Sequence, residues 1–185
     1  MYARKVFTKE VDFYQGDIID DFPLFIFTED FNLLDESEPK DNFKIRKVET
    51  ISTNPKKIIG AFPVELSRVI ILSQTCDIKN NNTVIVAPVY SLSAVIADGL
   101  LSEPNTKLVS KRRGAMKDWF YLPAIEGVIG ESFVDFQKIH YSPKKIFEQY
   151  REKRVIALSD WGIHLFSWAI SDYFGRPIED KYRTD

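Results

Sequence analysis

The residues of this 185-residue sequence that first suggest covalent chemistry are its one cysteine and its two histidines. Cys76 is followed by Asp77, and a Cys–His nucleophile pair would need His140 or His164 to approach the thiol in the fold. We favour the structural interpretation, because Cys76 shares strand parity with Ile70, which predicts a small buried core residue. One cysteine allows neither an intramolecular disulfide nor a cysteine-rich zinc site, and we expect no metal and no cofactor.

A run of polar side chains occupies positions 73–77 (SQTCD), directly after an apolar run. Polar groups at the end of a strand either satisfy a bulge or turn, or line a groove where they meet a ligand. For Ser73, Gln74 and Thr75 the sequence leaves both interpretations open, the second being contact with RNA or a partner. Asp77 is a candidate general base, and alternatively an Asx-turn residue ahead of three asparagines.

A basic cluster precedes an aromatic run: Lys111, Arg112 and Arg113 are followed by Trp119 and its neighbours in WFYLP. Cations beside aromatic rings suit single-stranded RNA, because rings stack on bases while cations pair with phosphates. The alternative, which we favour, is a basic loop followed by a core strand. The four residues are therefore candidates for RNA or partner binding, to be weighed against a structural role.

Charge and composition limit the function classes. The formal net charge is −2, from 25 basic and 27 acidic side chains, which argues against a generally basic nucleic-acid binder but allows a local basic groove. No apolar run approaches the roughly 18 residues of a membrane span, and residues 1–10 lack the apolar stretch of a signal peptide. With its single cysteine, the sequence predicts a cytoplasmic protein without membrane contact.

The elements that must position these residues begin with a central hairpin. Residues 69–72 and 83–89 are β-branched apolar runs separated by an asparagine-rich turn, which predicts two paired strands in the middle of a sheet. Gly16 permits an unusual turn just before the β-branched pair at 18–19. A further strand is predicted over residues 126–141.

Helices are expected over residues 92–101 and in the C-terminal part of the chain. Ser142 is predicted to cap a helix that has Pro143 in its first turn and continues to Val155. A last helix, capped at positions 159–160, runs to Phe174 before Gly175 ends it. Its core face is expected to hold the apolar residues Ile163, Phe166, Ile170 and Phe174.

Two tryptophans of that last helix stand seven residues apart. Trp161 and Trp168 therefore share one helical face, with His164 between them. Such a stripe is typical of a packing or dimer face rather than a cofactor site.

Taken together, the segments GDII (16–19), SRVIILS (67–73), TVIVAPV (83–89) and ESFVDFQKIHYSPKKI (131–146) resemble the MazF/PemK-like pattern. The resemblance implies a mainly β fold with helices (α+β), namely a single-domain SH3-like barrel with inserted segments and a C-terminal helix. Its parts would be a barrel core at about 14–19, 67–90 and 119–140, insertions at about 20–66 and 91–118, and a helical region at 142–175.

The resemblance also assigns roles to residues. Arg68 matches the arginine that, in this family, acts as an acid or stabilises the developing phosphorane charge. The family's second functional position is a Thr or Ser at the end of the next strand; here Tyr90 stands there, and Ser91 matches after a shift of one residue. The proline that commonly follows the arginine is replaced by Val69.

Two hypotheses of different classes follow. The first is a metal-independent endoribonuclease acting on single-stranded RNA in a prokaryotic toxin or defence system, with Arg68, Tyr90, Ser91 and Asp77 as its catalytic candidates. The second is a catalytically inactive barrel that acts as a protein-interaction or regulatory module in a phage-defence or transcription-regulating complex. The resemblance implies an antitoxin or a defence-system component as protein partner, and a homodimer packed through barrel edges and the last helix. A ribonuclease should gather basic groups around Arg68, whereas an interaction module should expose an apolar patch.

Overall fold

The structure, a computed structural model, describes residues 12–25, 32–34, 45–47, 60–61, 63–99 and 118–175. The chain divides into two compact units, one made of residues 1–22 and 67–185 and the other of residues 23–66. In the second unit, β2 (Asn32–Leu34), β3 (Ile45–Lys47) and β4 (Gly60–Ala61) form a small antiparallel sheet in the order β3-β2-β4. Whether residues 20–66 are an insertion into a smaller barrel stays a prediction.

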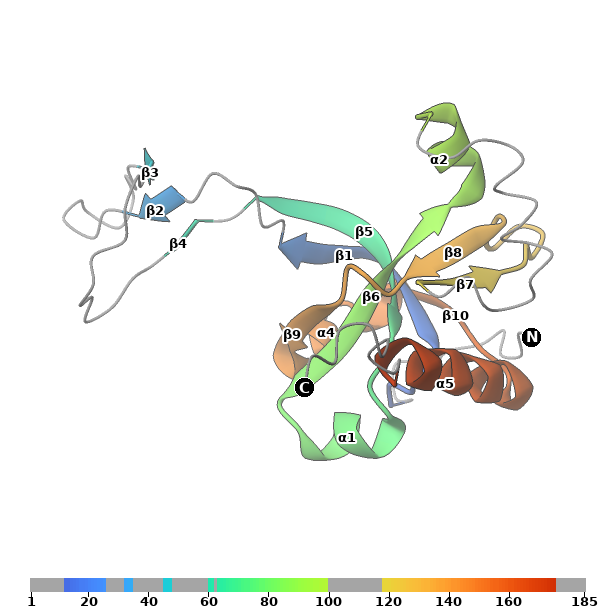
Figure 1. Cartoon of the computed structure of the whole chain (residues 1–185). Helices are drawn as coiled ribbons and strands as arrows, with labels where there is room; N and C mark the ends of the chain where they lie inside the picture. The colour runs from blue at the N-terminus through green and yellow to red at the C-terminus, as the bar shows by residue number, and fades with distance from the viewer. Residues whose placement is uncertain are drawn as a thin grey trace, which may run out of the picture. The chain divides into compact units, whose positions relative to one another are not determined.

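A seven-stranded sheet, dominated by antiparallel pairing, is the main feature of the fold (Figure 1). Its order is β10-β1-β5-β6-β8-β7, with β9 also beside β6. The strands are β1 (Asp17–Phe25), β5 (Val64–Ile71), β6 (Thr83–Ser91), β7 (Trp119–Leu122), β8 (Ser132–Asp135), β9 (His140–Pro143) and β10 (Arg154–Ala157). The predicted α+β class is confirmed, but a barrel is not, because the pairing among the described residues leaves the sheet open between β10 and β7.

The predicted central hairpin is present, with a more elaborate connection than expected. Val69 lies opposite Pro88 and Ile70 opposite Ala87, so β5 and β6 pair as antiparallel neighbours. The connection holds a helix, α1 (Thr75–Asn80). The buried position predicted for Cys76 is wrong: strand alternation stops with β5 at Ile71, and the thiol lies exposed on α1.

Gly16 joins three strands at one point. Its φ of +83° is the left-handed conformation that glycine adopts readily, as the sequence predicted. Its N–H donates to Ile71 O (3.0 Å), and its own carbonyl accepts from Leu158 N–H (3.1 Å). A Cβ at this position would lie 3.1 Å from the Leu158 side chain, so the approach of the two chain segments also requires glycine.

The helices described are α1, α2 (Leu92–Ala97), α4 (Lys144–Gln149), a 3₁₀ turn (Arg151–Lys153) and α5 (Asp160–Phe174). The helix expected from position 92 is confirmed over its first part. Ser142 is not a cap: it lies buried in β9, opposite Val84, and Pro143 occupies the N-cap position of α4 without a side-chain hydrogen bond. Val155 belongs to β10 instead of continuing a helix. The predicted strand 126–141 is split by a turn into β8 and β9.

The last helix, α5, covers one face of the sheet. Ser159 caps it by accepting a hydrogen bond from Gly162 N–H (3.1 Å), as the sequence predicted. Phe166 is fully buried against Phe120, with ring centroids 5.0 Å apart. Phe174, expected on the core face, is 64% exposed, because the helix ends beyond the apolar cluster that Phe166 enters. No helix within the described part of the chain is long and apolar enough to cross a membrane.

Candidate functional site

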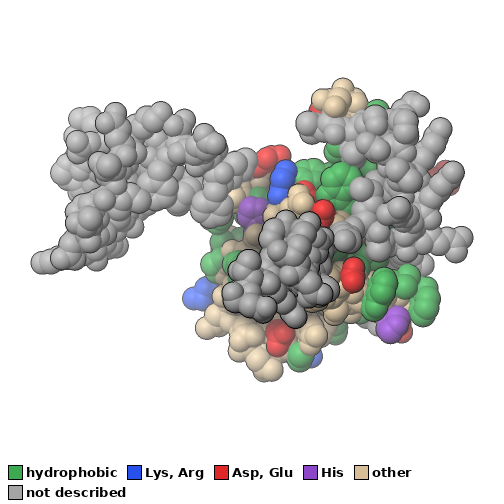
Figure 2. Space-filling model, viewed as in Figure 1, with side chains coloured by type: hydrophobic (Ala, Val, Ile, Leu, Met, Phe, Trp, Pro, Cys, Tyr) green, Lys and Arg blue, Asp and Glu red, His purple; other side chains and the backbone are tan. Residues whose placement is uncertain are grey.

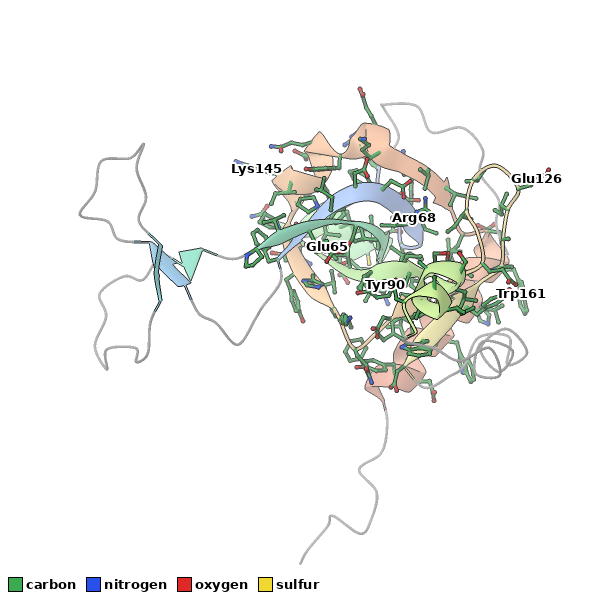
Figure 3. The ribbon with its side chains drawn as sticks, turned by 90° about the horizontal axis from the view of Figure 1, so that it is seen from above. Glu65, Arg68, Tyr90, Glu126, Lys145 and Trp161 are labelled. Atoms are coloured by element: carbon green, nitrogen blue, oxygen red, sulfur yellow. The ribbon has the colours of Figure 1, made fainter. Side chains whose placement is uncertain are left out.

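The guanidinium of Arg68 is held in a half-buried ion pair within the chain. Arg68 lies on β5 beside β1, where its Nε donates to Asp20 Oδ1 and its Nη2 donates to Asp20 Oδ2 (2.8 Å). Each side chain is 29% exposed, and the hydrogen bond to Asp20 raises the pKa of Arg68 above its ordinary value. A carboxylate thus takes both arms of the fork that a phosphate would need. Figure 3 labels this arginine on β5.

The charges next to this ion pair are also balanced. Asp21, which follows Asp20 on β1, accepts a hydrogen bond from Lys153 Nζ (2.7 Å) and has a φ of +53°, which is uncommon for a residue other than glycine. Asp21 also contributes to the raised pKa of Arg68. Two carboxylates therefore face two cations here, so this cluster does not form the basic groove that a ribonuclease centred on Arg68 would need.

Strand alternation separates Arg68 from Tyr90. Val69 lies opposite Pro88, and Tyr90 follows Pro88 by two residues, so Tyr90 lies on the sheet face of Val69. Arg68 precedes Val69 by one residue and lies on the opposite face. The same counting puts Ser91 on the face of Arg68. Of the two hydroxyl candidates, only Ser91, which matches the family position after a shift of one residue, lies on the same sheet face as Arg68.

Tyr90 instead joins Trp119 in an aromatic cluster on the other face. Phe133 lies opposite Tyr90 on β8, and its ring centroid is 5.7 Å from that of Tyr90 and 4.7 Å from that of Trp119. Lys138 Nζ lies 3.3 Å from Tyr90 Oη and 5.0 Å from the ring centroid. The structure thus brings a predicted catalytic residue and a predicted binding residue together. The cluster is partly buried and includes Leu92 of α2, which favours packing as its role.

Two ionisable groups lie beside this cluster. Burial raises the pKa of Asp135, which lies opposite Trp119 and accepts hydrogen bonds from Gln137 N–H (3.0 Å) and from the Trp119 side chain. Burial, with a hydrogen bond to Glu131, raises the pKa of Tyr121 to about 12. Both shifts favour the neutral form of the side chain. The shift keeps the Tyr121 phenol protonated at neutral pH, so Tyr121 is a weak candidate for a base.

The polar run at 73–77 forms a corner of the fold. Ser73 is 8% exposed and accepts Ile85 N–H (2.8 Å), and Thr75 Oγ1 accepts Gln15 N–H (3.3 Å). Gln74 is exposed at the start of α1, and Asp77 lies in its first turn. The contacts of Ser73 and Thr75 favour their structural interpretation, whereas binding through Gln74 stays a prediction.

The remaining candidates are dispersed. The Ser91 hydroxyl lies 2.8 Å from that of Ser93 at the start of α2. The Cys76 thiol lies on α1, and the two histidines lie on β9 and α5. Within the described residues, no group of three or more His, Cys, Asp or Glu side chains is placed to hold a metal ion. The basic cluster at 111–113 lies outside the described residues.

Sequence reasoning missed Asp20, the residue that decides the state of Arg68. Asp20 lies on β1 just after a register shift between Ile18 and Ile19, and an acidic side chain at this position was visible in the sequence. The sequence does not show which cation it meets, because the contact joins residues 48 positions apart.

Two tryptophans of α5 are exposed to solvent. Trp161 is 64% and Trp168 61% exposed, and the His164 ring stacks on Trp161 with centroids 5.7 Å apart and planes 24° apart. We call Trp161, His164 and Trp168 the aromatic stripe. Figure 2 shows hydrophobic side chains around a histidine over this part of the molecule. The side chains on the opposite side of α5, including Phe166 and Ala169, are buried, so the helix is apolar on both faces.

The chain matches no known protein-family model and no curated protein. The resemblance to the MazF/PemK-like pattern therefore stays a prediction. The geometry of the larger unit offers a guanidinium that is already bound to Asp20 and a helix face that presents rings to solvent.

Proposed function

We propose that this chain is a non-catalytic protein-interaction module on an SH3-like scaffold, with the outer face of α5 as its contact surface. The observation that carries the proposal is the exposure of Trp161 and Trp168 on a helix whose other face is already buried. Large exposed rings grouped on one element mark interaction surfaces, because burying them against a partner removes apolar area from water. Of the four exposed large hydrophobic residues described in the larger unit, three belong to α5: Trp161, Trp168 and Phe174, with Tyr141 on β9 as the fourth.

The ribonuclease alternative requires a free guanidinium at Arg68, and this group is already bound to Asp20. To stabilise a phosphorane, the Arg68 fork would first have to leave Asp20, and the phosphate would enter a place already facing the charge of Asp21. The hydroxyl candidates do not complete the constellation, since Tyr90 lies across the sheet and Ser91 lies beside Ser93. The SH3-like scaffold is supported by the central hairpin, the strongly antiparallel sheet and the packed terminal helix.

Incubation of purified protein with a labelled single-stranded RNA pool in EDTA tests this proposal. Wild type is compared with Arg68→Ala, which removes the guanidinium, and with Asp20→Asn, which loosens its ion pair. We expect intact RNA with all three proteins. Cleavage by wild type that is lost in Arg68→Ala would overturn the proposal. Cleavage that appears only in Asp20→Asn would show that the scaffold keeps latent chemistry that Asp20 suppresses, and would also overturn a purely non-catalytic assignment.

A further inference from the structure

The aromatic stripe lies on an acidic helix. The residues of α5 include Asp160 in the first turn and Asp172 near the end, both exposed, and no Lys or Arg. The carbonyl end of a helix carries a partial negative charge, and here the last turn has no basic residue to offset it. Carboxylates of α5 therefore stand near both ends of the stripe, Asp160 next to Trp161 in the sequence and Asp172 four residues after Trp168.

The spacing of the stripe fits a helical partner. Trp161, His164 and Trp168 recur at i, i+3 and i+7, and Asp172 continues the same line one turn later. From Trp161 to Asp172 this line is about 16 Å long at 1.5 Å per residue. A partner helix of three turns would cover it with apolar side chains over the rings and cations near the carboxylates.

The same charges argue against three other occupants. RNA would place phosphates beside carboxylates, without a lysine or arginine of α5 to neutralise them. An anionic membrane surface is normally met by helices rich in Lys and Arg on the polar face, which α5 lacks. A second copy of this chain packed helix against helix would bring together two sets of carboxylates without a cation from either helix.

We propose that the aromatic stripe binds an amphipathic partner helix whose apolar seam is flanked by Lys or Arg. This inference rests on the proposed function and adds the chemistry of the partner. The partner's cations lie near Asp160 and Asp172 and over the exposed indole faces, where a cation gains from the ring's negative potential. Its apolar seam covers Trp161 and Trp168, and aromatic residues of this kind carry most of the energy in protein interfaces.

Two matched synthetic peptides test the inference. Both are alanine-based helices with leucines at every third or fourth position, and they carry either Lys or Glu beside the leucine seam. Binding to the full chain is measured by calorimetry at 0.1 M and 0.5 M salt. Three variants are compared with wild type: Trp161→Ala/Trp168→Ala, Asp160→Asn/Asp172→Asn, and Tyr141→Ala as a control that removes an equally exposed ring from β9.

We expect the Lys peptide to bind at least tenfold more tightly than the Glu peptide. The double tryptophan variant should weaken binding of the Lys peptide at least tenfold, the double aspartate variant should weaken it severalfold and reduce its salt dependence, and Tyr141→Ala should leave it unchanged. Absence of binding, equal affinity for both peptides, or affinity that is insensitive to the tryptophans overturns the inference. So does dimerisation of the free chain that the tryptophan variant abolishes. Tighter binding of the Glu peptide through the tryptophans would overturn the inference of a basic partner, but it would keep α5 as the interaction face. Cleavage of RNA would overturn the proposed function itself.

Discussion

The charged side chains along β1 are paired within the chain, whereas the aromatic rings on the outer face of α5 are exposed to solvent. Around β1, each of three neighbouring carboxylates meets a cation of the same chain: Asp17 with Arg154, Asp20 with Arg68, and Asp21 with Lys153. On α5, the His164 ring stacks on Trp161, and both Trp161 and Trp168 are exposed to solvent. The carboxylates of this helix have no cation on the same element.

The carboxylates of β1 are already paired within the chain, whereas the rings of α5 remain accessible to a partner. A guanidinium already held by two hydrogen bonds gains little from a new anion, because the existing pair must be broken first. When a partner covers an exposed indole, no contact within the fold has to be broken, and burial of the apolar ring is favourable. Interaction through α5 is thus compatible with the fold as it stands, whereas chemistry at Arg68 requires rearrangement.

The largest expected effect comes from the most deeply buried charge pair. Arg154 Nη1 donates to Asp17 Oδ2 (2.8 Å), and both side chains are almost fully buried. Asp17→Asn removes the carboxylate charge from the buried guanidinium, and we expect a loss of about 3–5 kcal/mol in the free energy of unfolding. Urea denaturation measures it, with Asp172→Asn on α5 as the exposed control. A loss below 1 kcal/mol would show that this charge is compensated elsewhere.

The two faces of α5 should respond differently to removal of a ring. Phe166→Ala deletes a buried ring that packs on Phe120 and Phe136, and we expect a loss of about 3–5 kcal/mol. Trp168→Ala deletes an exposed ring and should change stability by no more than about 0.5 kcal/mol. Thermal and chemical denaturation compare them. A large loss on Trp168→Ala would show that the stripe supports the fold and would remove the main argument for a contact surface.

A smaller effect is expected at the half-buried ion pair. In a double-mutant cycle, Arg68→Ala and Asp20→Ala should show a coupling of about 1 kcal/mol, since both side chains remain partly solvated. The exposed pair of Lys79 and Asp12, 3.8 Å apart, serves as the control and should show no measurable coupling. A cycle without coupling at Arg68 would mean that its guanidinium is free to bind another anion.

The smallest effect is a dependence on pH at Asp135. Burial raises its pKa in the folded chain above the ordinary value of 3.8, so the fold favours the neutral acid. That contribution to stability is complete below the ordinary pKa and is lost as pH rises through the folded pKa. Asp135→Asn, which imitates the neutral acid, should match wild type at pH 3 and be slightly more stable at pH 7. Unfolding measured at both pH values checks this, and the opposite order would show that the ionised carboxylate is the form the fold stabilises.

Local patterns were sufficient for the parts of the fold that depend on neighbouring residues. The β-branched runs at 69–72 and 83–89 predicted the hairpin, and the Ser159 cap with the 3.6-residue period predicted α5. Local sequence patterns did not predict where some helices and strands begin and end. Val155 continues a helical spacing but pairs as a strand, and Ser142 looks like a cap but pairs with β6, because tertiary pairing overrides local preference.

The sequence by itself determined that the two tryptophans share a helical face, since a spacing of seven residues places two side chains on one face of a helix. That this face is exposed was decided by the tertiary structure. The sequence did not determine the state of Arg68. Only the tertiary structure brings Asp20 to the guanidinium from 48 residues away and separates Tyr90 onto the other face of the sheet. The physical reason is range: helical periodicity acts over a few residues, whereas an ion pair between strands depends on register and pairing order, which no short segment encodes.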